Sequence, residues 1–179
     1  PVPEYHGLPI IWSGGFAEDF TLPEIRHIRS QYAGTITLVD KWTGIFLEKI
    51  RELGLLDNTM VIIISDHGEP LGEHGLLAKC QPWCYDELAR VPLFIRLPDG
   101  MEAKRQVDDF TNMPDVATTI LSFLGVETPP TMHGKNLLPI MRGEEKGMDF
   151  AISGFHVGKW SIRNHKWSCH KVSDIEWPG

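Results

Sequence analysis

Asp66 and His67, two residues whose side chains bind metal ions, stand side by side directly after an apolar run of the sequence. The run covers residues 60–65 and is rich in isoleucine, as expected of a strand buried on both faces. In open α/β sheets, ligands gather where such strands end, because the loops there converge. Gly68 and Gly72 follow and permit tight turns. We therefore expect Asp66 and His67 to form the edge of a metal site.

Further polar residues follow in the same Gly-rich loop. We expect Glu69, Glu73 and His74 to hold this loop in shape through hydrogen bonds, with direct contact to the site as the alternative. Asp40 lies earlier in the chain, beside an apolar stripe. A carboxylate satisfied by neighbouring donors is the favoured interpretation of Asp40, and a catalytic role is the alternative.

The elements that must position the loop follow from the periodicity of the sequence. Apolar residues at steps of three and four predict a long helix that begins at Thr21 or Leu22 and ends at Gly54. Strands at about 60–65 and 91–97 flank the loop, and a helical turn is expected over 83–89. The rest of the pattern comprises a helix over 115–124, a connection over 127–143, and antiparallel strands after Phe150 that turn at Asn164 and His165.

Strand, helix and strand alternate through the first two-thirds of the chain. This order favours an α/β fold with a mainly parallel, three-layer α/β/α sheet, followed by a small antiparallel α+β appendage. We place the boundary between residues 1–145 and 146–179. Both ends of the sequence look cut, so we expect the sheet and the appendage to be incomplete.

Composition limits the classes of partner. The 179 residues are 42% hydrophobic and carry a formal net charge of −7, which argues against nucleic acid and against anionic membrane surfaces. No apolar stretch approaches the roughly 20 residues that span a bilayer. Three cysteines are an odd number and too few for a disulfide framework, which mildly favours a reducing compartment.

Several motifs in a fixed order resemble the sulfatases of the alkaline phosphatase superfamily. They begin with the segments 58–69 and 71–75, and continue with Lys79, Tyr85-Asp86-Glu87 and Arg90-Val91-Pro92-Leu93. The segments 114–121, 124–126 and 134–139 also agree, as do Tyr32-Ala33 and Val39-Asp40 before the strand. The resemblance covers roughly residues 24 to 170 and implies an alkaline phosphatase-like fold and hydrolysis of sulfuric esters.

The resemblance also implies a site. A divalent cation, most commonly calcium and in some branches manganese or zinc, would be held in part by Asp66 and His67. Lys79 would contact the sulfate and its bridging oxygen, where a compact positive charge stabilises the departing anion, and a plain surface lysine is the alternative. Many sulfatases have asparagine where this chain has His67, and the softer imidazole leaves phosphonate or phosphodiester hydrolysis open.

The formylglycine nucleophile of the family is not found. Its signature is similar to Cys/Ser-x-Pro-Ser/Ala-x-Arg, whereas Cys80-Gln81-Pro82-Trp83-Cys84 lacks the last two positions and follows the metal motif. A metal clip formed by Cys80 and Cys84 is also disfavoured. We therefore expect a fragment, inactive alone, whose partners are a small-molecule or saccharide sulfate ester and the missing N-terminal part of the enzyme. A non-catalytic metal- or anion-binding module is the alternative from another class.

Overall fold

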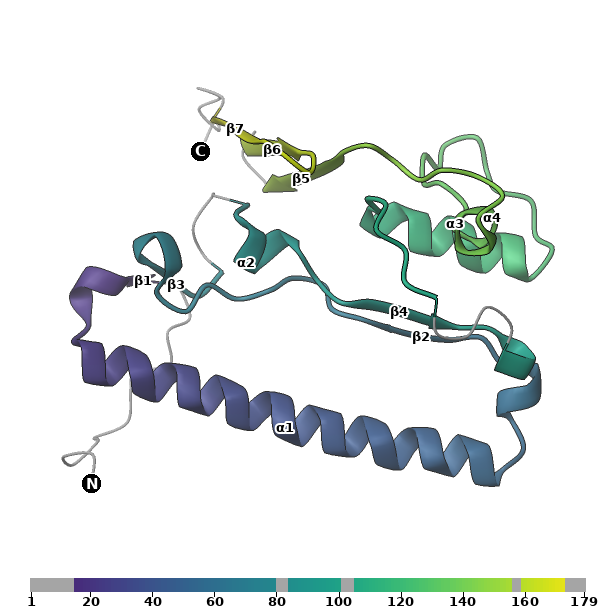
Figure 1. Cartoon of the computed structure of the whole chain (residues 1–179), viewed down its shortest axis with the longest axis horizontal. Coiled ribbons are helices and arrows are strands. Elements are labelled where there is room, and N and C mark those ends of the chain that lie inside the picture. Colours follow the sequence, from purple (N-terminus) through teal and green to yellow (C-terminus); the bar gives the residue numbers. More distant parts are fainter. Residues whose placement is uncertain (1–14, 80–83, 101–104, 156–158, 173–179) are drawn as a thin grey trace. The chain divides into compact units, whose positions relative to one another are not determined.

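The computed structural model describes residues 15–79, 84–100, 105–155 and 159–172 (Figure 1). These residues belong to two compact units. The first unit contains the chain up to residue 56 together with residues 67–91, and the second contains residues 57–66 together with residues 92–179.

The first unit contains the long helix and the Gly-rich loop. Its elements are β1 (Gly15–Phe16), the 3-10 turn Ala17–Asp19, α1 (Leu22–Glu52), the 3-10 turn Glu73–Gly75, β3 (Leu76–Leu77) and α2 (Asp86–Ala89). β1 pairs antiparallel with β3, which joins Gly15 to Leu77 and Phe16 to Leu76. Leu76 and Leu77 are buried and anchor the end of the loop.

The predicted start of α1 is confirmed, and its cause is a capping box. The Thr21 side chain accepts from the third residue of the helix, while the Glu24 carboxylate accepts from the Thr21 amide at 2.7 Å. At the other end, Gly54 takes a left-handed conformation with φ of +67°, which stops the helix at little steric cost. No helix in the described ranges is both long enough and apolar enough to cross a bilayer.

The second unit contains the strand that leads to the site. Its elements are the 3-10 turns Leu56–Asn58 and Pro98–Gly100, β2 (Val61–Ile64), β4 (Leu93–Arg96), α3 (Met113–Phe123), α4 (Leu138–Arg142), β5 (Ala151–Phe155), β6 (Lys159–Arg163) and β7 (Ser168–Val172). The helix α4 falls within the stretch 127–143 that the sequence suggested was only a connection.

β2 and β4 pair antiparallel, from Val61 opposite Arg96 to Ile64 opposite Leu93. This direction differs from the parallel pairing that the apolar run suggested for these two strands. The reason is that an isoleucine-rich run indicates contact on both faces of a strand, whereas its direction relative to a neighbour is set by the connection between them. In the described parts of the chain, every pairing between named strands is antiparallel.

The antiparallel appendage is confirmed over the described residues 151–155 and 159–172. β6 pairs with both β5 and β7, so the three strands form one sheet in sequence order. The predicted turn between β6 and β7 also forms, because the Asn164 side-chain oxygen accepts from the amides of Lys166 and Trp167. The division of the chain at residues 145 and 146 stays a prediction.

Candidate functional site

His67 lies at the exit of β2, and backbone contacts fix the chain beside it. The Gly68 amide donates to the Leu88 carbonyl at 2.8 Å. A Cβ atom at Gly68 would lie 2.0 Å from the Glu87 carbonyl oxygen, so a side chain at this position has no room. The turn that carries His67 is therefore held against α2, and the approach requires glycine at position 68.

The contacts of the His67 ring define its tautomer. Nδ1 lies 2.8 Å from the Gly68 carbonyl oxygen, which can only accept, so Nδ1 carries a proton. Nε2 lies 3.0 Å from the Lys79 ammonium nitrogen, which can only donate, so Nε2 presents its lone pair. In this tautomer the Nε2 lone pair is directed at the Lys79 ammonium group. A metal-binding histidine is oriented in the same way, with one ring nitrogen fixed by a carbonyl and the other left to ligate.

The structure brings two of the three predicted site residues together. Lys79 reaches His67 across twelve positions of sequence, although most of the lysine side chain is exposed. Asp66 directly precedes His67 and is also exposed. The roles of Asp66 and His67 as ligands, and of Lys79 in catalysis, stay predictions.

Glu69 belongs to the same electrostatic environment. Desolvation by burial raises the pKa of Glu69 above its ordinary value, and the protonated form of His67 together with the Lys79 ammonium only partly offsets this increase. The carboxyl group of Glu69 therefore takes up a proton more readily than an exposed glutamate does.

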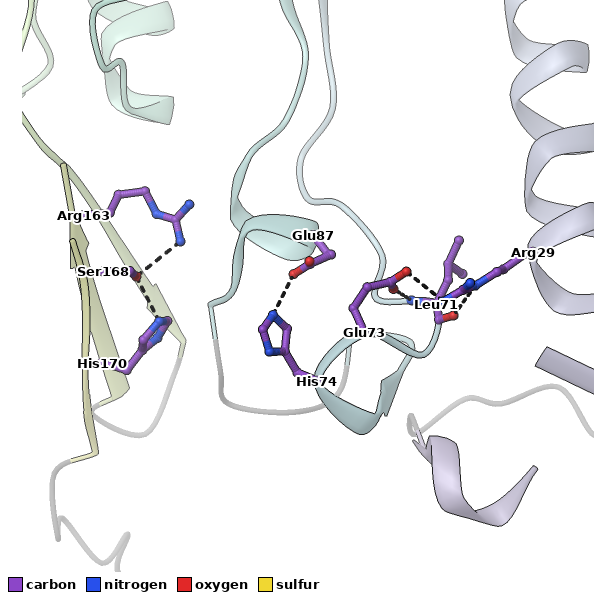
Figure 2. A network of polar contacts seen from close by, with 8 residues as sticks. All are labelled: Arg29, Leu71, Glu73, His74, Glu87, Arg163, Ser168 and His170. Carbon is purple, nitrogen blue, oxygen red and sulfur yellow. Dashed lines mark hydrogen bonds and ion pairs between the residues drawn. The ribbon is translucent and has the colours of Figure 1, made fainter. Parts of the chain in front are cut away.

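Glu73 connects the loop to α1 (Figure 2). One carboxylate oxygen accepts from the Leu71 amide at 2.7 Å, and the other accepts from Arg29 Nη2 at 2.9 Å. Arg29 Nε donates to the Leu71 carbonyl at 2.8 Å, which closes the arrangement. Burial acts to raise the pKa of Glu73, but the Leu71 amide, its own amide, Arg29 and His74 together outweigh burial and lower the pKa.

His74 connects the same loop to α2. Its backbone is left-handed, with φ of +53°, a conformation that costs a non-glycine residue roughly 1 kcal/mol or more. Its ring stacks on Tyr85 at a centroid distance of 3.9 Å, and Nε2 lies 3.6 Å from a Glu87 carboxylate oxygen (Figure 2). The expectation that hydrogen bonds hold the loop is confirmed for Glu73, whereas His74 holds the loop through ring stacking and an ion pair.

The residues present fit a divalent cation only in part. Across the described ranges, no three His, Cys, Asp or Glu side chains gather as a metal-binding group. The oriented imidazole of His67 and the carboxylate of Asp66 are suitable donors, so the fit is that of two ligands out of a larger set. Cys80, which the sequence disfavoured as a nucleophile, lies outside the described residues, and Cys84 is buried.

Sequence reasoning missed the three residues that restrain the loop, Arg29, Tyr85 and Glu87. Tyr85 and Glu87 stand in a motif that the family resemblance had marked, but without a role. Arg29 lies 42 positions before its partner Leu71, and no local spacing signals such a contact. Its position one helical turn after Ile25, whose methyl group also faces Gly72, is the signal that could have placed it.

Comparisons with known proteins agree with these motifs. A family model described as Sulfatase matches residues 12–126. N-acetylglucosamine-6-O-sulfatase of Bacteroides thetaiotaomicron is 37% identical over 115 residues, which cover 64% of this chain and 20% of the relative. Arylsulfatase K of Bos taurus is 30% identical over an alignment of 191 residues, gaps included, which covers 97% of this chain and 34% of the relative.

A solved structure described as a complex with its substrate, D-glucosamine-2-N,6-O-disulfate, has a similar fold. Its TM-score is 0.62 at 29% identity, and the match covers 80% of this chain and 31% of that one. The chain thus spans about a fifth to a third of the length of the proteins described above.

Proposed function

This chain belongs to the sulfatase family, and we propose that it supplies two cation ligands and a leaving-group contact to a complete sulfuric ester hydrolase. The expected family and α/β fold class are confirmed by these relatives. The proposal assigns Asp66 and His67 as ligands of a divalent cation, with calcium favoured over manganese and zinc. It assigns Lys79 to the oxygen that departs with the alcohol.

The observation that carries the proposal is the fixed orientation of the His67 imidazole. Because Gly68 binds the Nδ1 proton, the Nε2 lone pair is available in the direction where Lys79 now lies. A bound cation would withdraw charge from the sulfate oxygens and favour attack on sulfur. Asp66 adds a hard oxygen donor of the kind that calcium prefers. The remaining ligands and the nucleophile would come from other parts of the complete enzyme.

Lys79 would act on the leaving group. When the ester bond to sulfur breaks, negative charge develops on the alcohol oxygen, and a nearby ammonium group stabilises that charge. The ammonium can also donate a proton to this oxygen, so that the product leaves as a neutral alcohol. A cation on Nε2 would replace the contact between Lys79 and His67, and Lys79 could then turn toward the substrate.

The substrate we propose is a sulfated saccharide. Two of the similar proteins carry names that refer to sulfated glucosamine, one as N-acetylglucosamine-6-O-sulfatase and one as a complex with glucosamine disulfate. These names support the saccharide class for this chain, and the position of the sulfate on the sugar stays open.

Replacing Lys79 by glutamine tests the leaving-group role in the full-length protein that contains this chain. We expect kcat for an aryl sulfate to fall about 10²–10³-fold, as when one charge-stabilising group is removed. Lys49→Gln is the matched control, because Lys49 is exposed on α1 and pairs only with a glutamate one turn away. A Lys79→Gln variant with kcat within threefold of the parent would contradict the assignment.

Calorimetry with calcium and manganese tests the ligand role and the alternative of an autonomous binding module. On this chain alone we expect weak binding, because two ligands do not complete a coordination shell. In the full-length protein, Asp66→Asn should weaken binding at least tenfold. Micromolar binding to the isolated chain that Asp66→Asn abolishes would favour the module instead.

Phosphonate or phosphodiester hydrolysis is the second candidate, and the observation that favours it is the imidazole ligand at position 67. The ratio of kcat/KM for an aryl sulfate to that for an aryl phosphonate decides between the two. We expect this ratio to exceed one in the full-length protein. A ratio below one would assign the site to phosphonate esters.

A further inference from the structure

One face of the sheet formed by β5, β6 and β7 is lined with hydrogen-bonding side chains. The register places Ser153, Ser161 and His170 in one cross-strand row and Arg163 opposite Ser168 in the next. Because side chains alternate along a strand, these residues share one face. The other face carries Ile152, Trp160, Ile162, Cys169 and Lys171, most of which are exposed.

Three residues of the polar face form a connected cluster (Figure 2). Arg163 Nη2 lies 3.5 Å from the Ser168 hydroxyl oxygen, at the outer limit of a hydrogen bond. The same hydroxyl lies 3.0 Å from His170 Nε2. The guanidinium, the hydroxyl and the imidazole therefore converge on one region.

Ser161 gives a second, independent indication that a ligand binds on this face. The residue is only 2% exposed, and its hydroxyl finds no hydrogen-bond partner in the described part of the chain. A buried hydroxyl without a partner costs about 1–3 kcal/mol, so such groups usually reflect a ligand or water that satisfies them. Ser161 stands directly opposite His170 in the sheet.

The charge of this segment is opposite to that of the rest of the chain. Residues 151–172 contain Lys159, Arg163, Lys166 and Lys171 and no aspartate or glutamate, which gives a formal charge of +4. The whole chain carries −7, so this segment has a net charge of the opposite sign because it lacks acidic residues. A local positive potential on an acidic protein favours anionic ligands.

We propose that Arg163, Ser168 and His170 form a second binding site, for a tetrahedral oxyanion group carried by a saccharide. A planar guanidinium presents paired donors that match the oxygens of sulfate or phosphate. The serine hydroxyl and a ring nitrogen of histidine add further donors. The preference for sulfate over phosphate rests on the proposed function; the oxyanion site itself does not.

The site would bind a sulfate group other than the one that is hydrolysed. Its affinity for a sulfated saccharide is therefore measured by binding and does not depend on turnover.

Binding measurements on the whole chain test the site. Isothermal titration would use glucosamine-2-N,6-O-disulfate, glucosamine, inorganic sulfate and inorganic phosphate, all in a Lys79→Gln background that disables the proposed catalytic contact. We expect the disulfate to bind and unsulfated glucosamine not to bind. Arg163→Gln should weaken disulfate binding at least tenfold, and Ser168→Ala about threefold.

Lys171→Gln is the matched control, because it removes one positive charge from the same sheet but from the opposite face. We expect the affinity of this variant for the disulfate to change less than twofold. Equal losses for Arg163→Gln and Lys171→Gln would overturn the site in favour of general charge attraction. Disulfate affinity unaffected by both Arg163→Gln and Ser168→Ala would also overturn it, and the exposed Ser168 keeps the test valid if Arg163→Gln fails to fold.

Two further outcomes separate this inference from the proposed function. If the full-length protein does not hydrolyse sulfate esters but Arg163→Gln still weakens disulfate binding, the oxyanion site stands and the hydrolase proposal fails. Binding of phosphate at tenfold higher affinity than sulfate would overturn the assignment to sulfated saccharides.

Discussion

Glu73 in the first unit and Asp115 in the second anchor the chain with the same arrangement of contacts. Each carboxylate uses one oxygen to accept from a nearby amide at 2.7 Å, from Leu71 in one case and Asn112 in the other. Each uses its second oxygen to hold a distant segment, through Arg29 for Glu73 and through the Lys135 amide for Asp115. The two differ in their surroundings, because Asp115 is 4% exposed while the Glu73 side chain is 37% exposed.

This difference separates contacts that maintain the fold from contacts that adjust a site. A buried carboxylate that loses its donors keeps its full desolvation cost, whereas an exposed one is solvated again by water. The junction between α3 and the segment that carries Lys135 thus depends strongly on Asp115. The loop that carries Lys79 is held by contacts that are individually weak, and changes there should alter the position of the lysine more than they alter stability.

Removing the buried anchor should have the largest effect. We expect Asp115→Ala to lower the free energy of unfolding by about 3 kcal/mol, because it removes two hydrogen bonds to a charged acceptor and with them one half of the capping box of α3. Urea unfolding measures this change, with Glu127→Gln, an exposed carboxylate, as the control. A loss below 1 kcal/mol would mean that burial does not distinguish Asp115 from Glu73.

The turn next to His67 should be nearly as sensitive. A methyl group at Gly68 would overlap the Glu87 carbonyl oxygen, so Gly68→Ala should cost about 1–3 kcal/mol through the shift it forces on the backbone. Gly34→Ala is the opposite control, since nothing lies within 4 Å of its added Cβ. It should stabilise α1 by roughly 0.5–1 kcal/mol, because alanine is the better helix former. Thermal unfolding of the two variants should therefore give shifts of opposite sign.

Much of this architecture could be predicted from the sequence, because its signals are local. The start of α1 follows from Thr21 and Glu24, which are three residues apart, and the turn after β6 follows from Asn164. The ordered motifs around Asp66 and His67 identified the family for the same reason, since each motif is a short segment with its own chemistry. Segments 114–121 and 134–139, which the resemblance also marked, are joined through Asp115 and Lys135.

The rest depends on contacts between residues far apart in sequence, which a single chain does not encode in its spacing. The direction of β2 relative to β4 depends on the path of the connection, and the apolar run carries no information about it. The Arg29–Glu73 contact spans 44 positions. The left-handed backbone of His74 runs against the preference of that residue and is compensated by stacking on Tyr85, so local propensity could not predict it.

The pH dependence of stability gives a smaller test of the exposed anchor. The pKa of Glu73 is lowered in the folded state, so its unfolded state takes up a proton first as the pH falls. The stabilisation by Glu73 is therefore complete above the ordinary pKa near 4.5 and is lost as the pH falls through the lowered value. The stability difference between the parent and Glu73→Gln, measured between pH 3 and pH 7, should shrink toward acid. A difference that grows toward acid would contradict the sign.

The direct coupling between Arg29 and Glu73 should be the smallest of these effects. Both side chains are substantially exposed, so a double-mutant cycle with Arg29→Met and Glu73→Gln should give about 0.2–1 kcal/mol. Arg29 also donates to the Leu71 carbonyl, so Arg29→Met alone should lower the free energy of unfolding by more than the loss of the ion pair with Glu73 explains.

Arg29→Lys is the informative third variant, because lysine keeps the charge but cannot donate to Leu71 and Glu73 with the same planar group. If Arg29→Lys restored the full stability of the parent, charge alone would hold the loop. We expect it to restore only part, because the contact combines an ion pair with a backbone hydrogen bond.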